Sequence, residues 1–323
     1  LFISNEGNFT YGNASLSYYD ITHSALVTNE DGSNDIFYSA NGIPLGDVAQ
    51  SAIVRGNTVY VIINNSGVIF AIDRRTAKII GTIRGLTSPR YMHFLSDTKA
   101  YVTDLYARAI TIVNPESCQI TGRIDVNNGY GRQHPTEQMV QYKNFVFTNC
   151  WSYDNKILVI DSDTDSVVDS IEVGIQPTSL VIDKYDKIWT ITDGGYKGSP
   201  YGHEEPCLYR IDAETRQIEK RIVFLNDAPS EVCLNGTRDT LYFINEAVWR
   251  MDVRADAVPG EPFLKYNNTI YYGLTVDPKT SEGYVADAID YVQNGVVYRF
   301  SPQAVPLDTL RVGITPGAFC FAE

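Results

Sequence analysis

The feature that most constrains this chain is a sevenfold internal repeat along its whole length. Each copy is an apolar run that ends in a polar residue and leads into a short polar turn. The copies read SYYDITHS, FAIDRRTAK, TIVNPESCQ, LVIDSDTDS, YRIDAETRQ, WRMDVRADA and YRFSPQAVP. Their closing residues lie 40 to 53 residues apart, at Asp20, Asp73, Asn114, Asp161, Asp212, Asp252 and Ser301. Self-similarity at such a period predicts an architecture of repeated supersecondary units.

Each unit contains four short runs rich in β-branched and aromatic residues, separated by Gly, Asn and Asp turns. The first run often starts behind a proline, which a strand tolerates at its first position; these are Pro89, Pro135, Pro177, Pro229 and Pro316. Four short strands per unit of about 46 residues, with no long helical period, are typical of a propeller blade. The sequence therefore predicts an all-β chain without helices, folded as a seven-bladed β-propeller with four-stranded blades.

The two chain ends complement each other. The segment from Ile314 to Glu323 is predicted to be an opening strand with no second strand after it, and the N-terminal LFISN a second strand with no opener. Their pairing would close the ring and remove two exposed sheet edges. We therefore expect one domain, 1–323, with blade 1 built from 1–29 plus 314–323. The other blades are expected at about 47–84, 88–125, 135–173, 176–225, 228–265 and 270–312.

Composition excludes several partners. The chain has 26 basic and 39 acidic side chains, a net charge of −13, whereas binding nucleic acid takes a basic face. No apolar stretch approaches the roughly 18 to 20 residues that span a bilayer. The scattered cysteines contain no C-x-x-C pair and are expected to be buried small hydrophobes; they are Cys118, Cys150, Cys207, Cys233 and Cys320.

Loop lengths predict where a ligand would bind. In a propeller, the second-to-third-strand loops and the links between blades share one face, and here these are the long connections. They run from Glu6 to Ser15, Glu30 to Gly46, Asp125 to Pro135, Asn149 to Asn155, Asp193 to Pro206, Lys265 to Tyr272 and Asp287 to Gly295. The opposite face has only tight turns. Long loops on a rigid scaffold commonly carry function.

These loops are rich in aromatic residues, which give binding surfaces stiff contact area with a polar tip. Packing of the loops onto the blade tops is the alternative explanation for any single ring. Arg90 follows Pro89 and would offer a cation at the channel rim, with Thr136, Thr178 and Ser230 expected at the matching positions. The expected ligand-binding residues are Tyr11, Tyr38, Arg90, Tyr130, Arg132, His134, Trp151, Tyr153, Tyr196, Tyr201, His203, Tyr271 and Tyr291.

Other polar residues have less specific interpretations. Glu137 and Glu231 are expected to contact other blades or channel water. His134 and His203 could donate to a ligand, bind a metal or relay a proton. A calcium-loop-like spacing from Asp161 to Glu172 has Ser166 where that loop needs glycine, and the hairpin repeat explains it. We therefore expect no metal site, no catalytic residues and no cofactor.

The segment LVIDSDTDSVVDSIEVGIQPTSLVID, Leu158 to Asp183, resembles the repeat of the YVTN-type seven-bladed propellers, V-I-D-x-x-T-x-x-V-x-x-x-I-x-V-G-x-x-P-x-x-Φ-x-V. By overall character the chain is similar to exported surface-layer-type propellers of gut bacteria. One branch of these captures cobalamin at the outer membrane for a TonB-dependent transporter.

The resemblance implies a non-enzymatic, exported, surface-located protein with a lipid anchor upstream of residue 1, which binds an amphipathic ligand such as a corrinoid. Two alternatives stay open: a lyase-type enzyme with a histidine and a glutamate at the channel mouth, and a surface-layer or protein-interaction scaffold.

Overall fold

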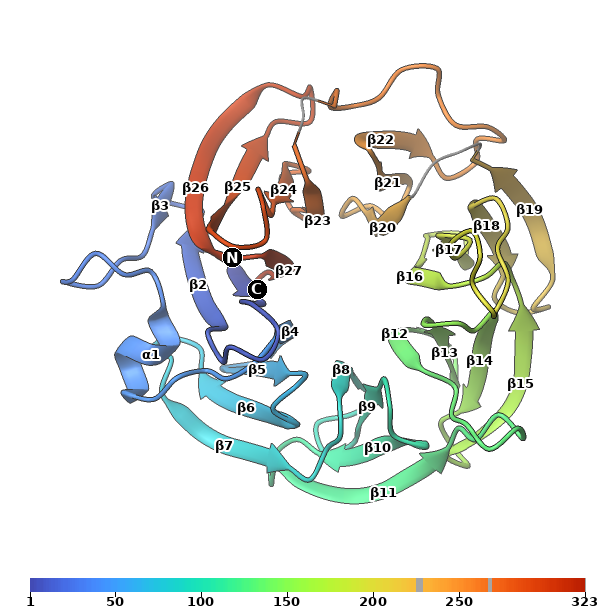
Figure 1. Ribbon diagram of the computed structural model, residues 1–323, viewed down its shortest axis with the longest axis horizontal. Helices are drawn as coiled ribbons and strands as arrows, with labels where there is room; N and C mark the ends of the chain where they lie inside the picture. The colour runs from blue at the N-terminus through green and yellow to red at the C-terminus, as the bar shows by residue number, and fades with distance from the viewer. Residues whose placement is uncertain (225–228, 267–268, 323) are drawn as a thin grey trace.

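The computed structural model describes residues 1–224, 229–266 and 269–322. Seven antiparallel sheets are arranged in a ring around a central channel (Figure 1). The innermost strands of neighbouring sheets contact one another around the whole ring. The predicted all-β, seven-bladed propeller is therefore confirmed. The expected boundary between blades 5 and 6, at 225–228, lies outside the described residues.

The strands follow in chain order within each sheet, from the channel outward, except that blade 1 starts with the last strand of the chain. Blade 1 contains β27 (Pro316–Cys320), β1 (Phe2–Asn5), β2 (Ser15–Asp20) and β3 (Ala25–Leu26). Blade 2 contains β4 (Ala49–Arg55), β5 (Thr58–Ile63), β6 (Val68–Asp73) and β7 (Ile79–Arg84). Blade 3 contains β8 (Pro89–Phe94), β9 (Ala100–Asp104), β10 (Ala109–Asn114) and β11 (Gln119–Asp125). Blade 4 contains β12 (Thr136–Tyr142), β13 (Phe145–Cys150), β14 (Lys156–Asp161) and β15 (Ser166–Glu172).

The remaining blades continue the pattern. Blade 5 contains β16 (Pro177–Ile182), β17 (Lys187–Thr192), β18 (Cys207–Asp212) and β19 (Ile218–Val223). Blade 6 contains β20 (Ser230–Leu234), β21 (Thr240–Asn245) and β22 (Ala247–Asp252). Blade 7 contains β23 (Tyr271–Val276), β24 (Gly283–Asp287), β25 (Asn294–Phe300) and β26 (Pro306–Ile314).

The chain ends close the ring as predicted. β27 pairs with β1 in antiparallel register, with Phe2 opposite Cys320 and Ile3 opposite Phe319. The two termini accordingly lie side by side in Figure 1. Hydrogen bonds between the first and last strands complete blade 1, so β1 is paired on both edges and β27 is its innermost strand.

The polar residue that closes each sequence repeat has a local structural role. At all seven positions its side-chain oxygen accepts a hydrogen bond from a backbone N–H two or three residues later. In blade 2, for example, Asp73 Oδ1 accepts from Arg75 N at 3.0 Å and from Thr76 N at 2.9 Å. The same contact occurs at Asp20, Asn114, Asp161, Asp212, Asp252 and Ser301. Such Asx and Ser turns form the hairpin to the outer strand, which explains why the repeat ends in these residue types.

The hydrophobic core is divided into seven clusters, one between each pair of neighbouring blades. The cluster between blades 5 and 6 contains Trp189, which is fully buried. Its Nε1 donates to Asp183 Oδ2 at 2.9 Å, and Asp183 Oδ1 accepts from the backbone of the following turn. Each blade thus buries its apolar faces against both neighbours, as repeat units that cannot fold alone must do.

Three local features differ from the sequence expectation. The insertion between blades 1 and 2 contains a helix, α1 (Ile36–Asn41), capped by Asp35, which accepts from two backbone N–H groups. Six residues are too few to show a helical period, and burial of Phe37 against Phe70 holds the helix in place. β3 has only two residues, and the described outer edge of blade 6 is reduced to a bridge between Val248 and Leu264. Among the described residues, no helix is long and apolar enough to span a membrane.

Candidate functional site

A β-bulge interrupts each innermost strand close to its start. In β8, for example, Pro89 pairs with Asp104 and the next regular pair is Met92 with Val102, so Arg90 and Tyr91 face one residue of β9. Equivalent register shifts occur in the other six blades. A bulge leaves its extra residue outside the ladder and redirects its side chain. The bulge residues are Gln50, Arg90, Tyr91, Glu137, Gln138, Thr178, Glu231, Tyr272, Gly273 and Gly317.

These bulge residues, except Gly273, line a cavity of about 480 Å³ in the central channel, here called the channel cavity. The innermost strands begin at the face that carries the long loops, so the bulges place the cavity at that end of the channel. Glu6, Trp151 and Asp193, which follow second strands, complete its wall. Repeated backbone irregularity therefore produces a polar site on the symmetry axis.

The bulges correct the expected alignment of the channel residues. Aligned by prolines, Arg90 was expected to match Thr136 and Ser230, but in the paired strands it matches Glu137 and Glu231. The reason is that Pro89 occupies the first ladder position in blade 3, whereas Thr136 and Ser230 hold that position in blades 4 and 6. Thr136 is fully buried and bonded to the backbone of Asp104, away from the cavity. Thr178 and Ser230 do line the cavity.

One buried ion pair organises the charges in the channel cavity. Arg90 Nε donates to both carboxylate oxygens of Glu137, at 2.8 and 2.9 Å, and Nη1 donates to Gln50. The side chains of Arg90 and Glu137 are 14% and 3% exposed. Burial raises the pKa of Glu137, and the adjacent guanidinium opposes that rise. Arg90 and Glu137 therefore form a largely desolvated pair.

Two further carboxyl groups in the cavity favour the protonated state. Burial raises the pKa of Glu6 to about 7, although Tyr272 donates to it at 3.0 Å. Burial and the nearby charges of Glu137 and Glu6 raise the pKa of Glu231 to about 8. At pH 7 the cavity thus presents a neutral carboxyl at Glu231, which can donate a hydrogen bond, besides the charged pair.

A second cavity of about 580 Å³ lies on the same face, between the loops of blades 3, 4 and 5. We call it the outer pocket. The rings of Tyr153 and Tyr201 pack with centroids 4.4 Å apart and planes tilted by 31°, and the Arg132 guanidinium lies 5.4 Å from the Tyr201 centroid. Arg132 Nη1 also donates to the Tyr201 hydroxyl at 2.6 Å. His134 and Tyr130 complete this side of the pocket.

A single loop separates the two cavities. It joins β13 to β14 and places Trp151 in the wall of the channel cavity but Tyr153 in the outer pocket. Trp151 Nε1 lies 3.5 Å from Asp193 Oδ2, and Gln176 donates to both oxygens of Asp193. The two cavities are thus neighbouring parts of one long-loop face.

The structure brings together seven of the thirteen expected binding residues. Arg90 and Trp151 line the channel cavity, and the outer pocket is lined by Tyr130, Arg132, His134, Tyr153 and Tyr201. The other six line neither cavity: Tyr11, Tyr38, Tyr196, His203, Tyr271 and Tyr291. Of these, Tyr291 packs edge-on against Tyr272 with centroids 5.7 Å apart. His203 instead contacts the Gly194 carbonyl through Nδ1 at 3.2 Å.

Several channel residues were not expected as binding residues: Glu6, Gln50, Tyr91, Gln138 and Asp193. Glu137 and Glu231 were expected only as contacts between blades or to channel water. A sequence signal for the bulge residues does exist, because each bulge lies within the first few residues of the opening strand of its repeat. Their convergence depends on a register shift that alternation along a strand does not predict.

The fold and its long-loop cavities define a seven-bladed β-propeller with a polar axial site. The chain belongs to the family described as "Domain of unknown function (DUF5074)", whose model matches residues 1–301. No curated protein sequence matches the chain.

Two solved structures show the same fold. Hydrazine synthase from Kuenenia stuttgartiensis is 16% identical with a TM-score of 0.69, covering 84% of this chain and 89% of that one. A quinonprotein alcohol dehydrogenase-like protein from Bacteroides thetaiotaomicron is 14% identical with a TM-score of 0.71, covering 96% and 75%. At such identities the likeness concerns the fold alone, because propellers carry unrelated functions.

Proposed function

We propose that this protein is a non-enzymatic binding propeller that captures an amphipathic small molecule on its long-loop face. The observation that carries the proposal is the close Tyr153–Tyr201 ring pair with Arg132 beside it, at the rim of the outer pocket. Flat rings with a polar edge and a cation suit a ligand that has both an apolar plane and hydrogen-bond acceptors.

The ligand class that we propose is a corrinoid such as cobalamin. A corrin ring is wide and carries amide arms, so it needs both a stacking surface and dispersed donors. The Tyr153–Tyr201 pair would contact the ring, while Arg132 would reach its amide oxygens. Such capture would serve an outer-membrane transporter if the protein is exported and lipid-anchored at a bacterial surface, which we include in the proposal.

The enzyme hypothesis predicts a histidine with a glutamate at the channel mouth. Among the described residues that line the channel cavity there are glutamates but no histidine. Binding without turnover is therefore the function that we propose.

Calorimetry with cyanocobalamin at micromolar protein tests the proposal. We expect saturable heat with one site, and recovery of the corrinoid unchanged by mass spectrometry. Tyr201→Ala should weaken binding tenfold or more, because it removes half of the ring pair. Tyr185→Ala is the matched control, since Tyr185 is also an exposed ring beside a cation, Lys184, but lies in a first-to-second-strand turn on the opposite face. Absence of heat with the wild-type protein would refute corrinoid capture.

A further inference from the structure

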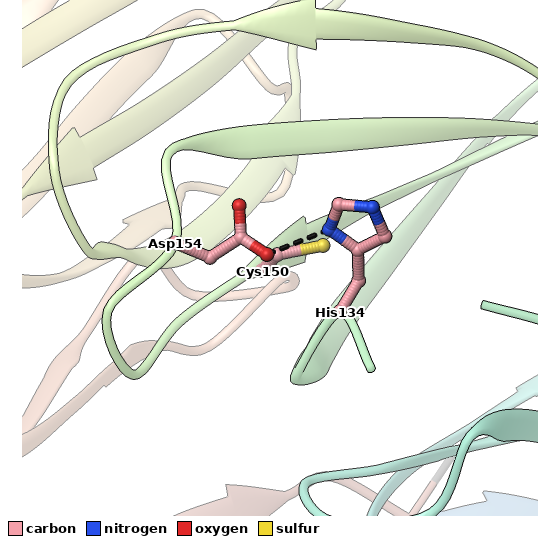
Figure 2. Close-up of side chains that lie close together, drawn as sticks. All are labelled: His134, Cys150 and Asp154. Carbon is pink, nitrogen blue, oxygen red and sulfur yellow. Dashed lines mark hydrogen bonds and ion pairs between the residues drawn. The ribbon is translucent and has the colours of Figure 1, made fainter. Parts of the chain in front are cut away.

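Three side chains with metal-binding atoms converge beside the outer pocket: His134, Cys150 and Asp154 (Figure 2). One ligand atom from each lies within 4.8 Å of the other two. His134 Nδ1 lies 2.7 Å from Asp154 Oδ2, shown as the dashed line, and the Cys150 sulfur lies beside them. We call these three residues the His–Cys–Asp cluster.

Strand pairing places the first two members. Cys150, the last residue of β13, is opposite Thr136 of β12, so His134, two residues before Thr136, lies next to the end of β13. The Trp151 N–H donates to the Pro135 carbonyl at 3.0 Å, and the His134 N–H donates to the Val126 carbonyl at 2.8 Å. Backbone contacts on both sides therefore fix the position of the histidine relative to the cysteine.

The loop after Cys150 turns back to bring in the third member. Ser152 and Tyr153 both adopt left-handed backbone conformations, with φ of 59° and 72°. Each such non-glycine residue costs roughly 1–2 kcal/mol and persists where surrounding contacts fix it. The consequence here is that Asp154, four residues after Cys150, faces the sulfur and the imidazole.

The cluster is also shielded from water. Cys150 is fully buried, while the His134 and Asp154 side chains are 20% and 12% exposed. Burial, followed by the nearby Asp154 charge, raises the pKa of the Cys150 thiol well above its usual value. Without a cation, therefore, the thiol keeps its proton. The only ion pair that the described residues give Asp154 is with His134.

We propose that the His–Cys–Asp cluster binds a divalent first-row metal ion, with Zn²⁺ as the best match. Imidazole nitrogen, thiolate and carboxylate are all zinc ligands, and a thiolate disfavours Mg²⁺ and Ca²⁺. The charges also balance, because one thiolate and one carboxylate neutralise a divalent cation in this buried place.

The geometry requires only small movements. Metal–ligand bonds of about 2.0–2.3 Å in a tetrahedron place the ligand atoms roughly 3.3–3.7 Å apart. His134 and Asp154 would separate slightly as the metal replaces the proton between them, and the most distant pair would close by about 1 Å. His134 and Asp154 line the outer pocket, so the fourth coordination position would face that pocket and accept water or a small nitrogen or oxygen ligand.

Binding must release the Cys150 thiol proton to solvent, because the thiolate is the form that binds the metal. An imidazole hydrogen on Nδ1 would move to Nε2, so His134 binds as the neutral ring. The affinity should therefore rise with pH. This inference does not depend on the corrinoid proposal, and its test uses no corrinoid.

The experiment titrates EDTA-treated protein with Co²⁺ and then with Zn²⁺. We expect one equivalent of Co²⁺ to give a thiolate-to-cobalt charge-transfer band in the near ultraviolet, and Zn²⁺ to abolish it. Cys150→Ser should remove the band, and Asp154→Asn should weaken Co²⁺ binding tenfold or more. Calorimetry in buffers of different ionisation enthalpy should show release of about one proton, from the Cys150 thiol.

Matched controls are present in the chain. Cys207→Ser alters the other fully buried cysteine, and His203→Gln alters another histidine of the long-loop face; neither should change the band. Circular dichroism identifies variants that fail to fold, and the wild-type band remains decisive if Cys150→Ser is one of them. No charge-transfer band in the wild-type protein, or a band unchanged in folded Cys150→Ser, would overturn the proposal.

Discussion

Replacement of Arg90 by methionine tests how much the buried Arg90–Glu137 ion pair in the channel cavity contributes to the stability of the folded propeller. Methionine keeps much of the length of the side chain but leaves Glu137, only 3% exposed, without its cation. Breaking a buried pair from one side costs about 3–5 kcal/mol, against a typical free energy of unfolding of about 5–15 kcal/mol. For a urea dependence of about 3 kcal/mol per molar, the unfolding midpoint should fall by roughly 1–1.7 M.

Urea unfolding followed by tryptophan fluorescence measures this shift. The double variant Arg90→Met/Glu137→Leu should recover most of the loss, because an apolar pair of similar size leaves no buried charge. Arg55→Met is the control: its pair with Asp97 is 2.6 Å long, but the side chains are 50% and 71% exposed, so the loss should stay below about 1 kcal/mol. Equal shifts for Arg90→Met and Arg55→Met, or a double variant no better than the single, would refute the reasoning.

Three further predictions follow from the same contacts. Because the pKa of Glu231 is raised to about 8, the native protein holds a proton that the unfolded chain loses above about pH 4.5, so wild-type stability should fall as pH rises from 5 to 9. Glu231→Gln should remove part of this fall, so its free energy of unfolding should exceed that of the wild type by on the order of 2–4 kcal/mol at pH 9 but by little at pH 5. Urea unfolding at several pH values measures this, and parallel stability profiles for the two proteins would contradict it. Trp189→Phe should lower the free energy of unfolding by about 1–3 kcal/mol, since it leaves a buried oxygen of Asp183 without its donor, and thermal denaturation with an unchanged midpoint would argue against that role. Deletion of 316–323 removes β27 and exposes β1, so size-exclusion chromatography should show aggregation and urea unfolding a broadened, less cooperative transition; an unaltered elution profile and transition would contradict this.

The expectations that held are those that depend on local pattern repeated many times. Alternation, turn residues and the closing polar residues such as Asp73 act within a few positions of the chain, so seven imperfect copies reinforce one another. The same regularity predicted the ring closure by β27 and β1 and the concentration of long loops on one face.

The register of the strand pairs, and the approach of residues that are distant in the sequence, depend on the folded chain. Arg90 and Glu137 occupy matching positions in their bulges. The proline is at the first ladder position in blade 3 but one residue before it in blade 4, and this difference obscured the match. The helix α1 depends on burial of Phe37 in a pocket that its own six residues do not specify.

The two cavities also combine features that the sequence predicts with features that depend on tertiary contacts. The sequence by itself determined that aromatic loops crowd one face, because loop length and topology follow from the repeat. Only the tertiary structure brought Cys150 beside His134 and Asp154, because their approach depends on cross-strand pairing and on two left-handed residues in one loop. Likewise, the raised pKa values of Glu6 and Glu231 result from burial on the ring axis, where seven strands distant in sequence meet.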